Sequence, residues 1–426
     1  MNILLLGSGG REHAFAWKLS QSKHCSKLYI APGNTGTAQC GINMPFAVTD
    51  FDAIKNCCVD EDISMVVIGP EEPLVKGLVD FLNKTFDSKV LVIGPSREAA
   101  QLEGSKAYAK AFMQRHGIPT AAYKEFTSEN FDEGISYLQQ HSLPIVLKAD
   151  GLAAGKGVII AQTREEAIRE FTAMIREAKF GEASQRVVVE EFLSGIELSV
   201  FVLTDGKDYL LLPEAKDYKR IGEGDTGLNT GGMGAVSPVP FADEAFMQKV
   251  ITNVVEPTIK GLEKDALDYK GFVFFGLIKV GDEPKVIEYN CRMGDPETEV
   301  VIPRIKNDLV ELLEATAKGN LSHQSIEKDP RYATTIVAVS GGYPEDFKKG
   351  FAITGLEKTT ADGLVFHAGT KAADGKIVTS GGRVLCATAL DESLQGAIAK
   401  SKKQLEQIQY EGMYYRKDIG YEFPDK

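Results

Sequence analysis

Lys148-Ala-Asp-Gly-Leu-Ala-Ala-Gly-Lys-Gly157 is a glycine-rich stretch that carries two lysines. A Walker phosphate-binding loop has four residues between its glycines, then Lys and a Ser or Thr, and it opens into a helix. Here three residues separate Gly151 from Gly155, and Lys156 is followed by Gly157 and then by Val-Ile-Ile. Because β-branched residues favour strands, we expect this loop to join two strands.

A glycine-rich connection between strands can still bring backbone N–H groups and lysine charge onto a polyphosphate. Lys148 ends the apolar run at 144–147, where a lysine must either reach solvent or meet an anion. We favour the anion, so the stretch is interpreted as a movable flap over a phosphate-bearing ligand. The alternative is a hairpin tip without function, because a short glycine-rich match is a weak signal.

Length and composition narrow the classes of protein that fit. The 426 residues predict two to four domains, at roughly 100 to 200 residues each. A net charge of -12 disfavours a nucleic-acid or anionic-membrane surface. The six cysteines and six histidines lack zinc spacing, and no Gly-x-Ser-x-Gly elbow occurs. With no signal peptide and no apolar run near the ~20 residues of a membrane helix, we expect a soluble cytoplasmic protein.

The first ~100 residues alternate short apolar strands with helical segments, which predicts a parallel α/β sheet. Ligands bind at the carboxyl ends of such strands. Beyond it we expect one helix over about 97–116, strands and turns over 144–290, further strands from 331, and a last helix over about 391–408. The predicted N-terminal strands are 3–6, 28–30, 65–68 and 90–93.

The turn after the first strand begins like a dinucleotide fingerprint, Gly-Ser-Gly-Gly-Arg-Glu at 7–12. That fingerprint needs a third glycine where Glu12 stands, and an acidic residue after the second strand, where the chain reads Ala-Pro-Gly-Asn. A nicotinamide cofactor is therefore not expected. A helix N-terminus beside Arg11 suits a single phosphate. A tight turn without a ligand is the alternative.

Two further segments carry candidate ligands. Side chains alternate along a strand, so Glu288 and Asn290 share one face, about 7 Å apart at Cα. Their oxygens suit magnesium beside substrate phosphates, although a solvated strand face has the same pattern. Upstream, the strand 187–193 could present backbone groups to an adenine edge, and Glu197 could accept a ribose hydroxyl. A hairpin within a core is the alternative there.

Taken together, seven segments resemble, in order, the phosphoribosylamine–glycine ligases of the ATP-grasp superfamily. The resemblance spans essentially the whole chain. Its markers are Gly-Gly-Arg-Glu-His at 9–13, Pro-Gly-Asn-Thr-Gly-Thr at 32–37, Gly-Pro-Glu at 69–71, Leu-Glu-Gly-Ser-Lys at 102–106, the stretch 148–157, Asn-Thr-Gly-Gly-Met-Gly at 229–234, and Glu-Tyr-Asn-Cys-Arg-Met-Gly-Asp-Pro-Glu at 288–297.

The resemblance implies a multidomain protein of α/β and α+β type with an ATP-grasp fold. An N-terminal parallel α/β substrate domain (pre-ATP-grasp) would span 1–103. The ATP-grasp domain would span 104–329, with a flap or lid subdomain at about 123–194. A small β-rich C-terminal domain would span 330–426.

The resemblance also implies the reaction. The enzyme would ligate glycine to 5-phosphoribosylamine with ATP, giving glycinamide ribonucleotide, ADP and phosphate via a glycyl phosphate, in de novo purine (IMP) biosynthesis. Such chemistry needs alignment and charge neutralisation more than a protein nucleophile. The alternatives are another ATP-grasp carboxylate–amine ligase and a noncatalytic ATP-binding sensor. By resemblance, the chain would act as a monomer on small-molecule substrates.

The family pattern assigns roles to individual residues. Anion stabilisation and catalysis would fall to Arg292, Gly294, Asp295 and Asp217. Mg²⁺ or Mn²⁺ would be bound by Glu288 and Asn290. The ATP site would comprise Lys106, Lys148, Gly151, Gly155, Lys156, Gly157, Glu190, Glu191, Phe192, Leu193 and Glu197. The phosphoribosylamine site would comprise Gly10, Arg11, Glu12, Asn34, Gly36, Thr37 and Glu71.

The sequence departs from the family pattern at two places. Where Ser-Gln-Asp-His-Lys-Arg is usual, residues 215–220 read Ala-Lys-Asp-Tyr-Lys-Arg, and Leu228 replaces a proline. These changes leave the glycine contacts of that loop open. Many ATP-grasp enzymes also carry an acidic metal ligand on the strand that here spans 272–280, which has none. We therefore expect two protein ligands to the metal.

Overall fold

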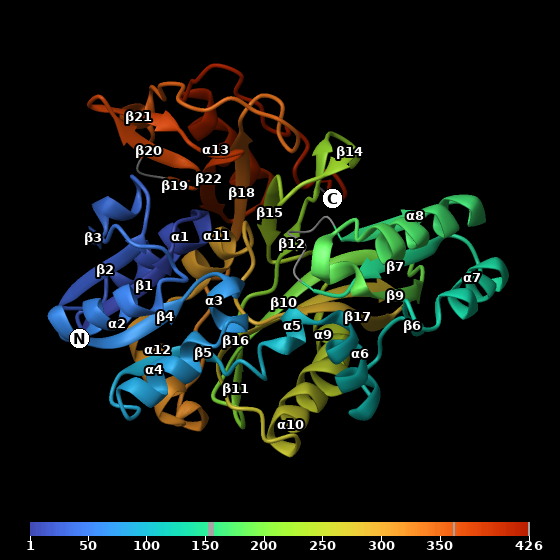
Figure 1. Cartoon of the computed structure of the whole chain (residues 1–426). Helices are drawn as coiled ribbons and strands as arrows, with labels where there is room; N and C mark the ends of the chain where they lie inside the picture. Colours follow the sequence, from blue (N-terminus) through green and yellow to red (C-terminus); the bar gives the residue numbers. More distant parts are fainter. Residues whose placement is uncertain (152–156, 361–362, 425–426) are drawn as a thin grey trace.

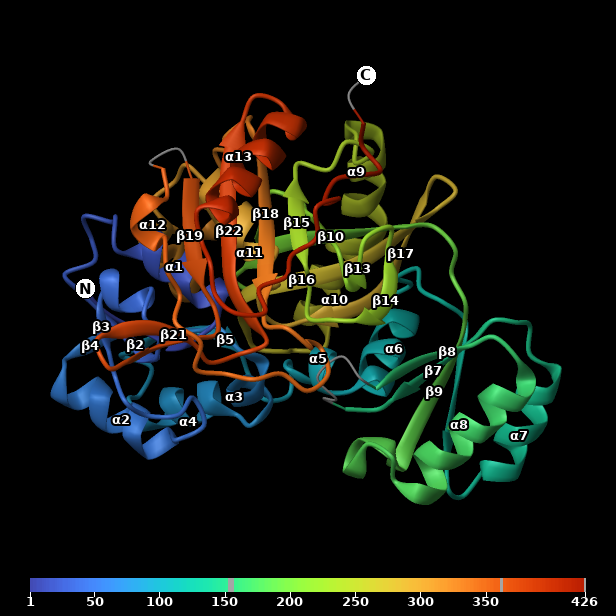
Figure 2. The same cartoon turned by 90° about the horizontal axis from the view of Figure 1, so that it is seen from above.

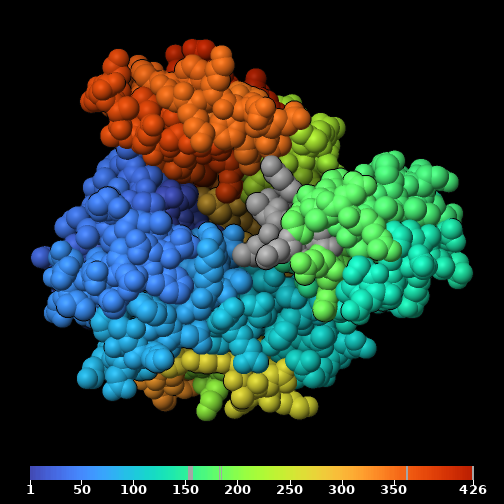
Figure 3. Space-filling view, viewed as in Figure 1, coloured from blue at the N-terminus to red at the C-terminus, as the bar shows by residue number. Residues whose placement is uncertain are grey.

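The computed structural model describes residues 1–151, 157–360 and 363–424 (Figure 1). A lid, coloured green, extends from one side of the molecule, and the C-terminal part lies above the N-terminal part (Figures 1 and 2). The space-filling view is hollowed between these two parts, next to the lid (Figure 3). Among the described residues, no helix combines the length and apolarity that crossing a membrane requires.

The N-terminal part is a parallel sheet, as predicted. Its strands are buried on both faces: Ile3 to Leu6 are all inaccessible to solvent. This is typical of a parallel sheet covered by helices on both sides. The strands run in the order β5-β4-β1-β2-β3, and the turns at their carboxyl ends begin helices α1 and α3. The bounds are β1 (Asn2–Gly7), α1 (Gly10–Leu19), β2 (Lys27–Pro32), β3 (Ile42–Asn43), α2 (Phe51–Asp60), β4 (Ile63–Ile68), α3 (Glu71–Val75), α4 (Leu78–Thr85) and β5 (Leu91–Pro95).

The central strands are antiparallel and extend this same sheet. Strand β16 (Tyr269–Val280) pairs with β5 through Tyr269 and Lys270, and with β10 (Ile196–Thr204) and β17 (Glu283–Asn290) along its length. Together with β11 (Tyr209–Leu211) they form one nine-stranded sheet. The turns that follow the N-terminal strands and the residues Glu288 and Asn290 of β17 therefore belong to one continuous sheet.

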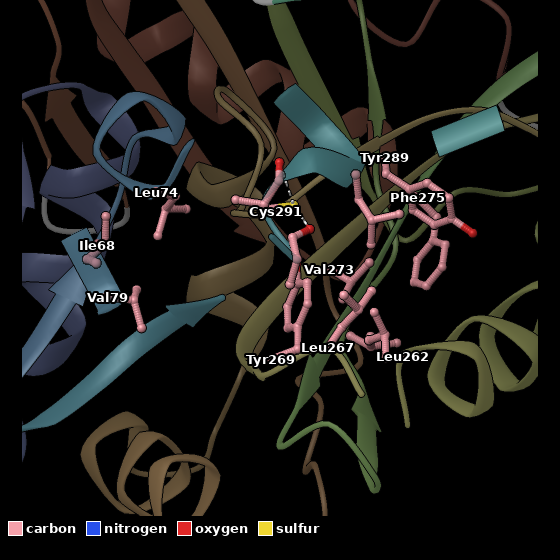
Figure 4. Packing of buried hydrophobic residues seen from close by; sticks show 14 of the residues in the cluster. Ile68, Leu74, Val79, Leu262, Leu267, Tyr269, Val273, Phe275, Tyr289 and Cys291 are labelled. Atoms are coloured by element: carbon pink, nitrogen blue, oxygen red, sulfur yellow. Dashed lines mark hydrogen bonds between the residues drawn. The ribbon is translucent and has the colours of Figure 1, made fainter. Parts of the chain in front are cut away.

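Helices cover both faces of this sheet with separate hydrophobic layers. Phe275 and Tyr289 pack with ring centroids 5.6 Å apart and contact the side of α10 (Glu256–Lys264), as Figure 4 shows. On the other face, Phe201 and Phe274 pack toward α1 and α12 (Leu309–Lys318). The first of these layers includes Val286 and Tyr289 of β17.

The prediction of one helix over about 97–116 is wrong in one respect, because the chain forms two helices there. They are α5 (Gln101–Gly104) and α6 (Lys106–Arg115). Ser105 between them is extended, and its hydroxyl accepts a hydrogen bond from the Tyr108 N–H. A serine N-cap of this kind starts a new helix. The break places the first turn of α6 at the central cavity.

The lid is a four-stranded sheet with a core of its own. The stretch 148–157 joins two antiparallel strands, as predicted, and part of it lies outside the described residues. Two helices cover one face, where Phe126, Leu147 and Phe171 are fully buried. The lid elements are β6 (Tyr123–Thr127), α7 (Phe131–Gln140), β7 (Ile145–Ala149), β8 (Val158–Ala161), α8 (Arg164–Glu177) and β9 (Arg186–Glu191).

Strands β9 and β10 are not a hairpin, which corrects the alternative interpretation of that segment. Strand β9 pairs with β6 and β7 in the lid, whereas β10 pairs with β11 and β16 in the large sheet. The connection at 192–195 therefore links the lid to the central part.

The C-terminal part is a five-stranded sheet with a helix against it. Two short central strands complete it, so the sheet is not made of late residues alone. The helix expected over about 391–408 is α13 (Leu394–Glu406). In order across the sheet, the strands are β12 (Lys216–Asp217), β15 (Gly234–Ser237), β18 (Tyr332–Val339), β22 (Arg383–Asp391) and β19 (Gly363–His367).

Candidate active site

A cavity of about 480 Å³ lies where the lid, the large sheet and the C-terminal sheet meet (Figure 3). Its walls come from β7 and β9 of the lid, from β10, β16 and β17, from the starts of α1, α3 and α6, and from the first residue of β22. Most of the side chains that face it are charged. Three lysines gather at the lid end, and arginines paired with carboxylates gather toward the N-terminal part.

Three lysines surround one carboxylate at the lid end. Glu190 pairs with Lys148 at 3.0 Å and with Lys110 at 3.2 Å, and all three side chains are almost completely buried. The Lys106 ammonium donates to the Gly151 carbonyl at 3.0 Å. Burial lowers the pKa of Lys106 and lowers that of Lys110 to about 8. Because three cations face one anion, this end can accept the charge of a phosphate group.

Glu288 and Asn290 both face the cavity from β17, as strand alternation predicts. Opposite Glu288 stands Gly276 of β16, where an added Cβ would lie 3.1 Å from Glu288 Cγ. In the described part of the chain, neither the Glu288 carboxylate nor the Asn290 amide makes a hydrogen bond or an ion pair. The oxygens of both residues remain open toward the cavity. This donor set fits a hard divalent cation such as Mg²⁺.

Arg292 is fixed by two carboxylates at the next position toward the N-terminal part. Its guanidinium contacts Glu103 at 2.7 Å and Glu71 at 3.3 Å. Burial raises the pKa of Glu103 to about 7, against the effect of Arg292. Burial alone would also raise the pKa of Glu71. The charges of Arg292 and Arg11 outweigh this and hold the Glu71 pKa below its usual range. The arginine is thus held in one orientation, which suits an anion-binding role.

Asp295 is held by groups from both ends of the chain. Its Oδ1 lies 3.1 Å from the Arg383 guanidinium, and its Oδ2 accepts from the Arg11 N–H at 3.4 Å. Arg383 also donates to the Gly231 carbonyl at 2.6 Å and to the Asp295 carbonyl at 2.8 Å. Burial would raise the pKa of Asp295, but Arg383 and Arg11 keep it below its usual range.

A second carboxylate cluster lies on the β10 side of the cavity. Glu297 accepts a hydrogen bond from the Ser199 hydroxyl at 3.0 Å, and Glu197 pairs with Lys219 at 2.5 Å. Burial and the nearby charge of Asp217 raise the pKa of Glu297 to about 7. Burial likewise raises the pKa of Asp217. This part of the cavity therefore contains one carboxylate, Glu297, that can exchange a proton near neutral pH.

The structure brings together most of the residues singled out in the sequence, although they come from distant segments. Gly155 and Lys156 lie outside the described residues. The sequence-derived residues that line the cavity are Arg11, Glu71, Lys106, Lys148, Gly151, Gly157, Glu190, Glu197, Asp217, Glu288, Asn290, Arg292, Gly294 and Asp295. Those that are described but lie off its wall are Gly10, Glu12, Asn34, Gly36, Thr37, Glu191, Phe192 and Leu193.

Several of the residues off the wall support the turn that carries Arg11. Glu12 is buried, and its carboxylate accepts from the Arg11 guanidinium and from the Gly9 N–H, both within 2.7 Å. The Asn34 amide donates to the carbonyls of Ser8 and His367. Asn34 Oδ1 accepts from the N–H groups of Gly36 and Thr37. These side chains fix the turn that carries Arg11.

The cavity-lining residues that sequence reasoning missed include Lys110, Arg383, Glu103, Ser199 and Glu297. Lys110 had a detectable signal, because it lies one turn after Lys106 on α6 and thus on the same helix face. For Arg383, the only local signal is its position after two glycines. The others are Glu103, Ser199 and Glu297, which lie inside or beside segments that were singled out for other residues.

Comparisons with known proteins cover nearly the whole chain. Three family profiles match: the phosphoribosylglycinamide synthetase N domain over residues 1–103, its ATP-grasp (A) domain over 104–298, and its C domain over 333–422. The chain is 46% identical to the phosphoribosylamine–glycine ligase of Yersinia pestis over 426 residues, which is 99% of this chain and 98% of that protein. It is 47% identical to the Haemophilus influenzae protein of the same name, with the same coverage.

Solved structures agree with this similarity. The phosphoribosylamine–glycine ligase of Thermotoga maritima has a TM-score of 0.85 and 35% identity, over 98% of this chain and all of that chain. The biotin carboxylase domain of the Hydrogenobacter thermophilus 2-oxoglutarate carboxylase has a TM-score of 0.72 at 16% identity, over 97% of this chain and 91% of that one. The second likeness concerns the fold alone.

Proposed function

This chain belongs to the phosphoribosylglycinamide synthetase family, and we propose that the cavity beneath its lid is where it joins glycine to phosphoribosylamine. Its relatives of the same length are named phosphoribosylamine–glycine ligases, so the chain is an ATP-grasp ligase of purine biosynthesis. One observation supports the location most directly. The buried lysines of the lid end and the open oxygens of Glu288 and Asn290 face the same cavity.

The nucleotide would lie between the lid and the large sheet. Lys106 and Lys148 would contact its phosphates, and Lys110, which the sequence did not indicate, adds charge beside them. The 151–157 stretch, including Gly155 and Lys156, would cover the phosphates. Glu191 at the end of β9, with Phe192 and Leu193 of the connection that follows, would frame the adenine. Glu197 would accept a ribose hydroxyl. In this arrangement Glu190 keeps the lysines oriented before ATP arrives.

Glu288 and Asn290 would hold Mg²⁺ or Mn²⁺. When bound, such an ion would supply positive charge that neutralises the phosphates. The fit rests on their two open oxygens, and no acidic side chain of β16 joins them. Two protein ligands are enough for Mg²⁺, which usually keeps several waters and substrate oxygens in its shell.

The chemistry proceeds in two displacements. The glycine carboxylate attacks the γ-phosphate of ATP, which releases ADP and forms a glycyl phosphate. The amine of phosphoribosylamine then attacks the acyl carbon and displaces phosphate. Arg292 and the Gly294 backbone would stabilise the negative charge that develops on the acyl phosphate. Asp217 would hold the ammonium group of glycine, because its carboxylate faces the cavity from β12.

Phosphoribosylamine would enter from the N-terminal end. Arg11 and Glu71 face the cavity there, and Asp295 lies beside them. Gly10, Glu12, Asn34, Gly36 and Thr37 would act by shaping the turn around Arg11. We propose further that the chain works as a cytoplasmic monomer, as the resemblance implies, and sedimentation of the purified protein tests its oligomeric state.

The assignment is tested by the dependence of ADP release on substrates. With ATP, Mg²⁺ and freshly generated phosphoribosylamine, ADP should form only when glycine is added, and glycinamide ribonucleotide should form in equal amount. ADP release that continues at the same rate without glycine, or without phosphoribosylamine, would refute the proposed reaction. ATP binding without turnover would instead indicate a sensor.

A further inference from the structure

The carboxylate of Glu297 is held rigidly at the edge of the cavity. Its side chain is 3% exposed, and the Ser199 hydroxyl donates to Oε1 at 3.0 Å. The backbone of Gly294 lies against the other side, because a Cβ added there would come within 2.3 Å of Glu297 Oε2. A hydroxyl and a glycine thus define one position for this carboxylate, a few residues from Arg292.

The two displacements leave one proton without an acceptor. When the amine nitrogen attacks the acyl carbon, a C–N bond forms and the C–O bond to phosphate breaks. The nitrogen then carries one hydrogen more than the amide product. A positioned base that removes this proton during attack commonly contributes about 10²–10⁴-fold to the rate. This inference rests on the proposed glycyl phosphate route.

Most carboxylates of the cavity are already engaged with a cation. Glu71 and Glu103 pair with Arg292, and Asp295 pairs with Arg383. At the lid side, Glu190 pairs with two lysines and Glu197 pairs with Lys219. A carboxylate bound to a cation is a weaker base, because the ion pair stabilises its charged form.

Three cavity carboxylates, within the described residues, have no ion pair at contact distance. Glu288 is assigned to the metal. Asp217 and Lys219 are each the strongest opposite charge acting on the other. Glu297 has the neutral hydroxyl of Ser199 as its side-chain partner.

We propose that Glu297 is the general base that accepts the proton of the attacking amine. The proton passes from nitrogen to the Glu297 carboxylate as the C–N bond forms, and phosphate leaves with the electron pair of the C–O bond. Water then takes the proton and restores the carboxylate. The charged groups that act on Glu297 are Asp217, Lys219, Arg292 and Glu299.

The test separates the two displacements in Glu297→Gln. Hydroxylamine is an uncharged nucleophile near neutral pH, and it traps glycyl phosphate as a hydroxamate without phosphoribosylamine. We expect the variant to keep ATP- and glycine-dependent hydroxamate formation within about threefold, while ligation to phosphoribosylamine falls by about 100-fold or more. In the wild type, kcat/KM for phosphoribosylamine should rise with pH around a midpoint near 7, and the variant should lose this rise.

Two further variants check the assignment. Burial also raises the pKa of Glu103 to about 7, but Glu103 pairs with Arg292, so Glu103→Gln should keep the rise. Ser199→Ala removes the hydrogen bond that lowers the Glu297 pKa, so the midpoint should move upward. This second readout does not depend on how well Glu297→Gln folds.

Four outcomes would overturn the proposal. Ligation by Glu297→Gln at the wild-type rate would do so. So would a pH rise that disappears in Glu103→Gln and persists in Glu297→Gln. Loss of hydroxamate formation in Glu297→Gln, with unfolding unchanged, would place the residue in the first displacement instead. Absence of hydroxamate with the wild type would refute the glycyl phosphate route itself, and the base assignment with it.

Discussion

At the scale of single residues, the positions of Glu288 and Asn290 follow from strand alternation, and their role follows from what surrounds them. Both oxygens face the lysine end of the cavity without a protein partner among the described residues. A carboxylate left open in this way is expected to act through a ligand and not through the fold.

The first prediction concerns this pair. Glu288→Ala should lower kcat by at least about 100-fold, because the phosphate charge loses its counter-ion, while the free energy of unfolding changes by less than about 1 kcal/mol. Steady-state kinetics and urea unfolding measure the two effects. Glu283→Ala is the matched control: Glu283 is exposed on the same strand and pairs with Lys249, so its loss should leave turnover intact. Wild-type kcat in Glu288→Ala would defeat the metal assignment.

A second prediction concerns Glu12, which supports the site from behind. Glu12→Ala should destabilise the protein by about 3 kcal/mol, because it leaves the buried Arg11 guanidinium and the Gly9 N–H without their acceptor. Urea unfolding measures it. Glu72→Ala removes an exposed pair with Lys76 and should cost less than about 1 kcal/mol. Equal costs for the two variants would mean that the Glu12 contacts are not important for stability.

The site residues that could be predicted from sequence are those with a local pattern. Lys148, Glu288 and Asn290 carry their signal in a strand of known direction and a glycine-rich turn. Arg383 has only its position after two glycines, and Ser199 has no local signal, because their neighbours in space come from distant parts of the chain. The pattern around Asn34 suggested a ligand contact. Its side-chain amide instead makes hydrogen bonds with backbone groups.

At the scale of elements, the lid has its own core, and we propose that it moves as a unit over ATP. Phe171 is the centre of that core. It packs against Phe126 and stacks on Phe131, and an added Cβ at Gly134 would lie 2.4 Å from its ring.

The third prediction follows from this packing. Phe171→Ala should destabilise the lid by about 3–5 kcal/mol and raise the KM for ATP, since an open or unfolded lid does not cover the phosphates. Hydrogen exchange should quicken in β6, β7 and β9 and remain unchanged in β1 and β4. Val59→Ala, at an exposed site, should change neither. Faster exchange across the whole molecule would show that the lid does not unfold separately.

Element boundaries were harder to predict than element types. The pattern over 97–116 is helical throughout, and only the extended backbone of Ser105 divides it. The strands on either side of 192–195 look like a hairpin, because turn residues separate them. Each strand instead pairs with partners far away in sequence, and a local pattern does not contain that information.

At the scale of the whole molecule, two buried histidines join the N-terminal and C-terminal parts. His13 of α1 accepts the His367 N–H at 2.8 Å, and burial lowers the pKa of His13 to about 3 and that of His367 to about 4. The unfolded chain binds these protons near pH 6.5. The histidines therefore stabilise the fold fully above pH 6.5, and this contribution is lost as the pH falls toward 4.

The fourth prediction isolates this contribution. His13→Gln should reduce the dependence of unfolding free energy on pH between 7 and 5 by up to about 1.4 kcal/mol per pH unit, which corresponds to one proton. Glu103 and Glu297 change the stability in the opposite direction, because a carboxyl with a raised pKa stabilises the fold at low pH. Both residues are present in the wild type and in the variant, so their effect cancels in the comparison. His323→Gln, at an exposed residue, is the control. An unchanged slope in His13→Gln would contradict the prediction.

The strand pairings that join distant parts of the chain into one sheet could not be predicted from local patterns. The alternation of strands and helices indicates the parallel sheet, but the pairing of β5 with β16 joins residues 95 and 269. Likewise, β12 and β15 belong to a sheet whose other strands lie about 100 residues or more downstream. Long-range pairing depends on tertiary packing, which the resemblance supplied and the residue pattern did not.

Arg383 has a consequence for how the chain can be divided. The side chain of Asp295, in the central part, is 13% exposed, and its ion-pair partner Arg383 comes from a strand 88 residues later. A chain that ended before β22 would keep Glu288, Asn290 and the lysines, but the Asp295 carboxylate would lose this ion pair and keep only its contact with Arg11. The C-terminal part therefore supplies the cation that pairs with Asp295. A chimera that takes this part from a relative must place an arginine next to the same carboxylate.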